Sequence, residues 1–154
     1  MATIPLKQSD LRTSSLDRNF ERSVDNEEDN SLDIAKIALE AALDKKCIEP
    51  KLIDVGDICS YANHLLVVSG RSDRQVEAIA TGIKHALAEA GHRPIGSEGL
   101  RSGQWALIDY GNVVIHVFYH AVREHYDLES LWIDGTTIDI DIPEDAHATL
   151  EDQY

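Results

Sequence analysis

Three histidines, His116, His120 and His125, lie close together in the sequence, and imidazole nitrogen is a common ligand for transition metals. On one strand, His116 and His120 would share a face, but four residues at about 3.3 Å each would separate them by about 13 Å. That separation is too large for both to bind one ion, and the sequence holds no Cys/His quartet of the kind that binds zinc. We therefore predict no metal site and interpret these histidines as surface or hydrogen-bonded side chains.

The strongest alternative hypothesis, an enzyme, is based on Gly70 and Ser72. These residues precede a predicted helix whose first amides could bind a phosphate. A nucleotidyltransferase-like, nucleotide-binding enzyme would also need two carboxylates shortly downstream to hold Mg²⁺ on the triphosphate. The Asp-x-Asp pattern of this chain begins only at Asp139, in an acidic segment far from Ser72. Gly70 and Ser72 are more simply a tight turn and a helix cap, so we predict neither catalysis nor a cofactor.

Charge and composition restrict the partners. The chain of 154 residues carries 14 Lys and Arg against 28 Asp and Glu, a net charge of -14, so most of its surface would repel a phosphate backbone. We predict no direct binding to nucleic acid, and no membrane span because apolar runs are short. The two cysteines, Cys47 and Cys59, lack a base partner and fit a reducing compartment. With no signal-peptide or transit-peptide features, a cytoplasmic location is expected.

By composition, the sequence divides into a core and two polar ends. Residues 1–30 lack hydrophobic periodicity and predict a disordered N-terminal arm. Residues 137–154 are rich in Asp and Glu, without Lys or Arg, and predict a disordered acidic tail. The folding unit is then residues 31–136.

Within this unit, hydrophobic periodicity predicts the elements. A helix runs from Ser31, as N-cap, to about residue 46, and a second helix runs from the capping pair Ser72 and Gln75 to Gly91. The runs KLIDV and LLVVS predict strands between them, and a short strand is expected at residues 94–96. A hairpin and a closing helix over residues 122–132 follow. The order αββαβββα predicts an α/β (α+β) domain with a mixed sheet of about five strands and helices packed on it.

The hairpin QWALIDY, Gly111-Asn112, VVIHVFY carries the most information. Because side chains alternate along a strand, a two-residue turn gathers its residues onto two faces. The first face is mainly aliphatic and suits burial under the helices. The second face combines aromatic and aliphatic side chains with an acid and a histidine, which would be costly to bury unpaired: Trp105, Leu107, Asp109, Val114, His116 and Phe118.

We interpret this second face as at least partly open. Exposed aromatic residues in a polar surround are typical of protein-binding hot spots. An alternative stays open at this point, because Trp105 and Phe118 could fill a second small core. The same exposed face could also let the free protein associate into a symmetric homodimer.

Four strings, GRSDRQVEAIA, SEG, WALIDYGNVVIHVF and REHYDLESLW, occur in this order between Ile34 and Trp132. Together they resemble the ribosomal silencing factor family, also called the Iojap family. The resemblance implies a fold distantly similar to nucleotidyltransferases, without catalysis. It also implies binding to a conserved large-subunit ribosomal protein, the fourteenth of that series, which blocks joining of the subunits and represses translation.

The family motifs assign candidate roles to matching positions. The resemblance, together with the exposed-face argument, gives as partner-binding residues Trp105, Asp109, His116, Phe118, Glu98 and Leu107. In the closing motif, the matching residues that could form a structural cluster or a rim for the partner are Arg123, Tyr126 and Glu129. Asn112 departs from the family pattern, in which an acid is usual at the hairpin turn. An acidic factor is also electrostatically suited to a basic ribosomal protein.

Overall fold

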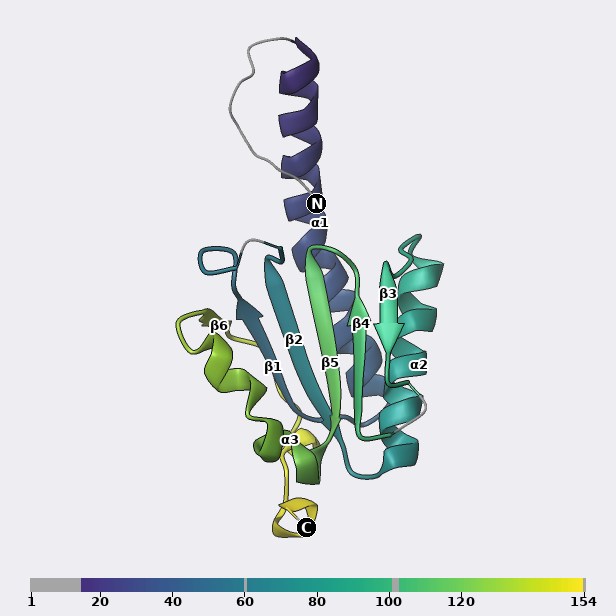
Figure 1. Ribbon diagram of the computed structural model, residues 1–154. Coiled ribbons are helices and arrows are strands. Elements are labelled where there is room, and N and C mark those ends of the chain that lie inside the picture. Colours follow the sequence, from purple (N-terminus) through teal and green to yellow (C-terminus); the bar gives the residue numbers. More distant parts are fainter. Residues whose placement is uncertain (1–14, 60, 101–102, 154) are drawn as a thin grey trace.

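The computed structural model describes residues 15–59, 61–100 and 103–153, in which six strands form a single mixed sheet (Figure 1). The elements in chain order are α1 (Ser15–Asp44), β1 (Ile48–Asp54), β2 (His64–Gly70), α2 (Asp73–Glu89), β3 (Gly96–Glu98), β4 (Trp105–Asp109), β5 (Val113–Tyr119), α3 (His120–Tyr126), η1 (Leu128–Trp132), β6 (Thr136–Ile138), η2 (Glu144–Ala146) and η3 (Leu150–Gln153). The predicted α+β class is confirmed, with one strand, β6, beyond the expected five.

The sheet has the order β3-β4-β5-β2-β1-β6, and only β2 and β5 run parallel. A parallel pair requires a crossover, which α2 supplies between β2 and the β3–β5 meander. Helices α1 and α2 cover one face of the sheet, whereas the other is only partly covered, by α3 against β5 and β2 and by η1 beside β1 (Figure 1). The larger buried cluster lies under α1 and α2, and a smaller one lies on the opposite face.

Helix α2 follows its sequence signals closely. The Ser72 hydroxyl accepts a hydrogen bond from the Gln75 amide at 3.1 Å, and the Gln75 side chain accepts one from the Arg71 amide at 2.6 Å. These contacts satisfy amides that the first helical turn leaves without a partner. Gly91 follows the helix with a φ of +92°, a conformation that favours glycine. Helical spacing predicts an apolar stripe of Val76, Ile79, Ala80, Ile83, Leu87 and Ala90, and all of these except the exposed Ala90 are buried.

Helix α1 begins at Ser15, so the predicted start at Ser31 is wrong. Ser31 is fully buried inside the helix, where its hydroxyl lies 2.6 Å from His64 Nδ1 and 3.4 Å from the Asn112 carbonyl oxygen. Its hydroxyl therefore ties α1 to the end of the sheet instead of capping a helix. Residues 15–30 of the expected arm are helical and extend beyond the sheet (Figure 1). The boundary between arm and domain at residue 31 stays a prediction.

The C-terminal segment also differs from the expected disordered tail. Strand β6 pairs antiparallel with β1, and Ala146 further along is buried. Arg71 contacts the Asp152 carboxylate at 3.2 Å, and Lys46 lies 4.0 Å from Asp145. A run of acids looks fully solvated when read alone, but its cationic partners are distant in sequence. Local composition could not reveal this pairing.

Two smaller elements are shifted from their predicted positions. The short strand β3 occupies Gly96–Glu98 instead of residues 94–96. The expected closing helix is divided into α3 and the 3-10 helix η1, because Asp127 between them adopts a left-handed conformation with a φ of 46°. Within the described ranges, no helix combines the length and apolar character needed to cross a bilayer.

Candidate protein interface

The register of the hairpin places its side chains on two faces as predicted. Trp105 pairs with Phe118, and Leu107 pairs with His116, so these four side chains share one face. The Tyr110 amide donates to the Val113 carbonyl at 2.9 Å and closes the two-residue turn. We call this surface the aromatic face, defined by Trp105, Leu107, Asp109, Val114, His116 and Phe118. It lies on the side of the sheet opposite α1 and α2, because Val114 and Phe118 belong to the small buried cluster and the residues of α1 and α2 to the large one.

Trp105 lies in the centre of a group of rings. Its indole Nε1 donates to His116 Nδ1 at 2.9 Å, and its ring stacks on Phe118 with 5.0 Å between centroids. The Tyr126 ring lies 4.5 Å from it on another side, and 47% of Tyr126 is exposed. Phe118 and His116 are buried, whereas Trp105 is half-buried. The deeper aromatic residues thus form the second small core, and Trp105 lies at its boundary with solvent.

The hydrogen bond from Trp105 determines the chemical state of His116. Because Nδ1 accepts this bond, the imidazole proton resides on Nε2. Burial lowers the pKa of His116 to about 4, so the ring is neutral at pH 7. A neutral ring avoids a buried charge on the aromatic face and keeps its acceptor available to the indole.

The two acids of the predicted site occupy different environments. Asp109 is half-buried at the end of β4, and its Oδ1 accepts a hydrogen bond from the Gly111 amide at 2.8 Å. Asp109 therefore stabilises the hairpin turn as well as adding charge to the face. Glu98 pairs with Leu107 across β3 and β4, so both side chains are on the aromatic face. Glu98 is exposed at the edge of the sheet.

Arg123 and Glu129 form a partly buried network that does not include Tyr126. Arg123 Nε donates to Glu129 Oε1 at 2.8 Å, and its Nη1 donates to the Glu49 carbonyl at 2.7 Å and to Ser69 Oγ at 2.9 Å. Burial opposes ionisation of Glu129, but the hydrogen bond and charge of Arg123 outweigh it and lower the pKa of this carboxyl. The network anchors α3 and η1 to the sheet.

Tyr61 was not predicted from the sequence as part of this region. It lies between β1 and β2, is 67% exposed, and meets Trp132 edge-on with 6.4 Å between ring centroids. Burial, followed by Cys59 and Asp109, raises the pKa of the Tyr61 hydroxyl. Its loop has neither strand alternation nor a helical stripe, so only an isolated exposed aromatic residue could have indicated it.

The residues that suggested an enzyme have structural contacts instead. Ser72 caps α2, and a Cβ on Gly70 would lie 3.0 Å from the Val76 amide nitrogen, so close packing explains the glycine. Burial raises the pKa of Cys47 to about 12, which leaves it a protonated thiol and a poor nucleophile. Across the ranges that the structure describes, no group of three or more His, Cys, Asp or Glu side chains could hold a metal ion.

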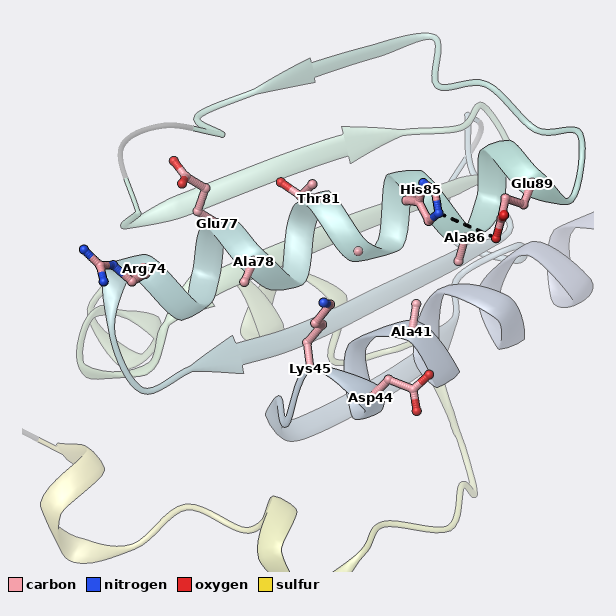
Figure 2. A pocket seen from close by; sticks show the side chains of 11 residues that line it. Ala41, Asp44, Lys45, Arg74, Glu77, Ala78, Thr81, His85, Ala86 and Glu89 are labelled. Atoms are coloured by element: carbon pink, nitrogen blue, oxygen red, sulfur yellow. Dashed lines mark ion pairs between the residues drawn. The ribbon is translucent and has the colours of Figure 1, made fainter.

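An open groove of about 670 Å³ lies between α1 and α2 (Figure 2). Trp105 packs against the smaller buried cluster on the other side of the sheet. Alanines such as Ala41 and Ala78 line the groove, and the aliphatic stem of Lys45 lies against Gly82. His85 Nε2 lies 3.7 Å from Glu89 Oε1 along its side, where both side chains are largely exposed and the contact is an ion pair only when the imidazole is protonated. Such exposed pairs contribute little energy. The groove and the aromatic face are separate surfaces.

Known proteins match nearly the whole of the described chain. Residues 28–153 match the family model "Ribosomal silencing factor during starvation", including the C-terminal segment that the motifs alone leave outside the family core. "Ribosomal silencing factor RsfS" of Chromobacterium violaceum is 43% identical over 100 residues, which cover 65% of this chain and 82% of the relative. The protein of the same name from Bacillus subtilis is 39% identical over 112 residues, which cover 73% of this chain and 95% of the relative.

Solved structures show the same relationship. A crystal structure of a Chromobacterium violaceum protein is 39% identical with a TM-score of 0.66, and covers 73% of this chain and 93% of its own. A crystal structure of a Bacillus halodurans protein is 33% identical with a TM-score of 0.64, and the match covers 71% of this chain and 99% of that one. The motifs, the fold and these matches agree, and the chain belongs to the ribosomal silencing factor family.

Proposed function

We propose that this protein binds a large-subunit ribosomal protein, the fourteenth of its series, through the aromatic face. By occupying the surface that the small subunit needs, it would prevent the subunits from joining and so repress translation. The observation that carries the proposal is the half-buried indole of Trp105, which lies among Phe118 and Tyr126 with acids nearby. Aromatic anchors at the centre of a contact commonly supply most of the binding energy.

The electrostatics support a basic protein as the partner. Asp109 and Glu98 belong to the same face as Trp105, and the whole chain has a net charge of -14. A ribosomal protein is typically basic, so association would be accelerated by attraction. The same negative charge disfavours bare RNA, which directs the factor toward protein surfaces. The bacterial relatives are themselves named ribosomal silencing factors, which supports the ribosome as the target.

The proposed mechanism is steric exclusion without turnover. The bound factor occupies space, so the fraction of blocked large subunits depends on its concentration and on the dissociation constant. The mechanism requires no proton transfer and no making or breaking of bonds by any group on the aromatic face. Neutral His116 would contribute by holding the indole of Trp105 in one orientation, which lowers the entropic cost of binding. Such a factor would act in the compartment that contains its ribosomes, which we place in the cytoplasm.

Truncation of the anchor tests this proposal. Trp105→Ala should weaken binding to purified large subunits by at least about 2 kcal/mol, or roughly 30-fold in the dissociation constant. Thr81→Ala, which truncates an exposed residue of α2 in the groove that faces away from the aromatic face, should bind normally. Thermal melting and circular dichroism must show that both variants are folded at the assay temperature. Unchanged co-sedimentation of the folded Trp105→Ala variant would refute the docking assignment.

A pull-down from lysate, with and without nuclease, identifies the partner. Recovery of one basic large-subunit protein after nuclease treatment is expected, and the Trp105→Ala variant should lose it. Recovery that requires intact RNA would contradict the proposed contact with a protein surface.

A further inference from the structure

The C-terminal segment after β6, residues 139–153, crosses the molecule and returns to α3. We call it the strap. Its 3-10 helix η2 contacts β1, and η3 contacts α3. Figure 1 shows the segment passing from β6 to the end of the sheet where α3 begins. Because a strap with six acids and no Lys or Arg repels itself, the rest of the chain must supply the attraction that holds it in place.

Arg71 is the main contact that fixes the strap. Its Nε lies 3.2 Å from one oxygen of the Asp152 carboxylate, and its Nη2 donates to the Asp145 and His147 carbonyl oxygens at 3.2 and 3.4 Å. The Asp152 side chain is only 7% exposed, and it also accepts from the Thr149 amide at 2.7 Å. One guanidinium thus joins three points of the strap, which is more specific than an ordinary exposed ion pair.

Helix α3 depends on such tertiary contacts. It has seven residues and no side-chain N-cap, and helices this short are not stable alone. Arg123 attaches it to β2 through Ser69, while η3 of the strap contacts it from another side. His120 in its first turn has a buried Nδ1, which is consistent with close covering of this end of α3.

Tyr126 connects α3 to the aromatic face. It is the last residue of α3, and its ring lies 4.5 Å from that of Trp105 and 6.0 Å from that of Phe118. Any loosening of α3 would therefore move Tyr126 relative to the indole. The chain of contacts runs from Arg71 through the strap to α3 and then to Trp105.

We propose that the strap, held by Arg71, positions α3 so that Tyr126 packs on Trp105 and completes the docking surface. Arg71 and Asp152 are then positioning residues for partner binding, although neither belongs to the aromatic face. This inference rests on the proposed function for its effect on affinity, but its structural part concerns the free protein alone. Release of the strap leaves the fold intact and removes the pre-organisation of Tyr126.

Hydrogen exchange on the free full-length protein tests the structural part. Arg71→Gln should accelerate amide exchange in α3 by about tenfold, and Asp152→Asn by about threefold, because each weakens the attachment of the strap. The matched controls Arg74→Gln and Glu151→Gln change the same charges at exposed neighbours that are not among the described partners of Arg71 and Asp152, and should behave as wild type. Unchanged exchange in α3 of Arg71→Gln would overturn the proposal.

The Trp105 indole N–H resonance reports the effect on the aromatic face. In Arg71→Gln it should shift, as the ring current of Tyr126 changes, while it should remain in place in Arg74→Gln. Raising salt from about 0.1 M to about 1 M shortens the screening length from about 10 Å to about 3 Å and should shift the wild-type resonance in the same direction. A shift that is equal in the Arg74→Gln control would count against the strap.

Binding to large subunits tests the link to function. Arg71→Gln should weaken binding by about threefold to tenfold, less than Trp105→Ala, and Arg74→Gln should not. If exchange accelerates in Arg71→Gln but its affinity equals that of wild type, the coupling of the strap to docking is refuted while the proposed function stands. If Trp105→Ala binds normally, the proposed function fails, whereas the exchange result still decides whether the strap positions α3.

Discussion

Trp105 and His116 depend on each other for their polar contacts. The indole N–H has an acceptor only while the imidazole is neutral, and the imidazole remains neutral because its burial disfavours a charge. Protonation of Nδ1 would place two donors against each other at 2.9 Å. The orientation of the proposed anchor is therefore linked to pH through a neighbouring side chain.

The pH dependence of stability follows from this link. The pKa of His116 falls from 6.5 in the unfolded chain to about 4 in the folded protein. The unfolded state therefore binds more protons between these values, so the stabilisation is complete above pH 6.5 and is lost progressively as the pH falls toward 4. The loss should be on the order of 3 kcal/mol.

Urea denaturation of wild type and His116→Phe between pH 7.5 and 4 measures this effect. The carboxylates titrate in both proteins, so only the difference between the two curves reports His116. The unfolding free energy of wild type should fall steadily relative to that of His116→Phe as the pH decreases below 6.5. Two parallel curves would show that His116 has an ordinary pKa in the folded protein.

Asp109 has two roles that two substitutions can separate. Asp109→Asn keeps an oxygen that can accept from the Gly111 amide but removes the charge, whereas Asp109→Ala removes both. We expect Asp109→Ala to lose about 1 kcal/mol of unfolding free energy and Asp109→Asn to lose much less. Chemical denaturation gives both values. Equal losses would mean that charge, and not the turn hydrogen bond, is what stabilises the hairpin.

At the scale of elements, sequence reasoning succeeded where the determinants are local. The hairpin register follows from the two-residue turn at Gly111 and from strand alternation, and the start of α2 follows from Ser72 and Gln75. It failed for Ser31, whose hydroxyl contacts His64, and for Asp152, whose partner is Arg71. In both cases the decisive partner is far away in sequence. The exposure of Trp105 could be inferred, but the covering ring of Tyr126 could not.

The attachment of α3 to the sheet leads to a prediction at this scale. Arg123→Met should remove about 3 kcal/mol of unfolding free energy, because Glu129, Ser69 and the Glu49 carbonyl lose their buried donor. Arg123→Lys keeps the charge but cannot reach all three acceptors, so it should recover only part of the loss. Thermal and urea unfolding of wild type, Arg123→Met and Arg123→Lys measure these losses. Full recovery by lysine would show that charge alone suffices.

At the scale of the whole molecule, the sheet separates two tasks. One face is closed by α1 and α2 over the main core, and the other is only partly covered, by α3 against β5 and β2 and by η1 beside β1 (Figure 1). The aromatic face is thus supported by a rigid sheet and stays partly accessible. The negative charge is spread over both sides, so the net charge alone does not say where a cationic partner would approach.

Two exposed glutamates allow local and overall charge to be separated. Glu98 is on the aromatic face, whereas Glu77 lines the groove between α1 and α2 on the other side (Figure 2). Glu98→Gln and Glu77→Gln change the net charge equally. At physiological salt, charges farther than about 8 Å from the contact are screened, so only Glu98→Gln should slow association with large subunits, by about twofold to threefold in stopped-flow measurements. At about 1 M salt this difference should disappear, because both rates then lack electrostatic attraction. If the two variants slow association equally at physiological salt, the partner is attracted by the net charge of the whole molecule and not by the charges on the aromatic face.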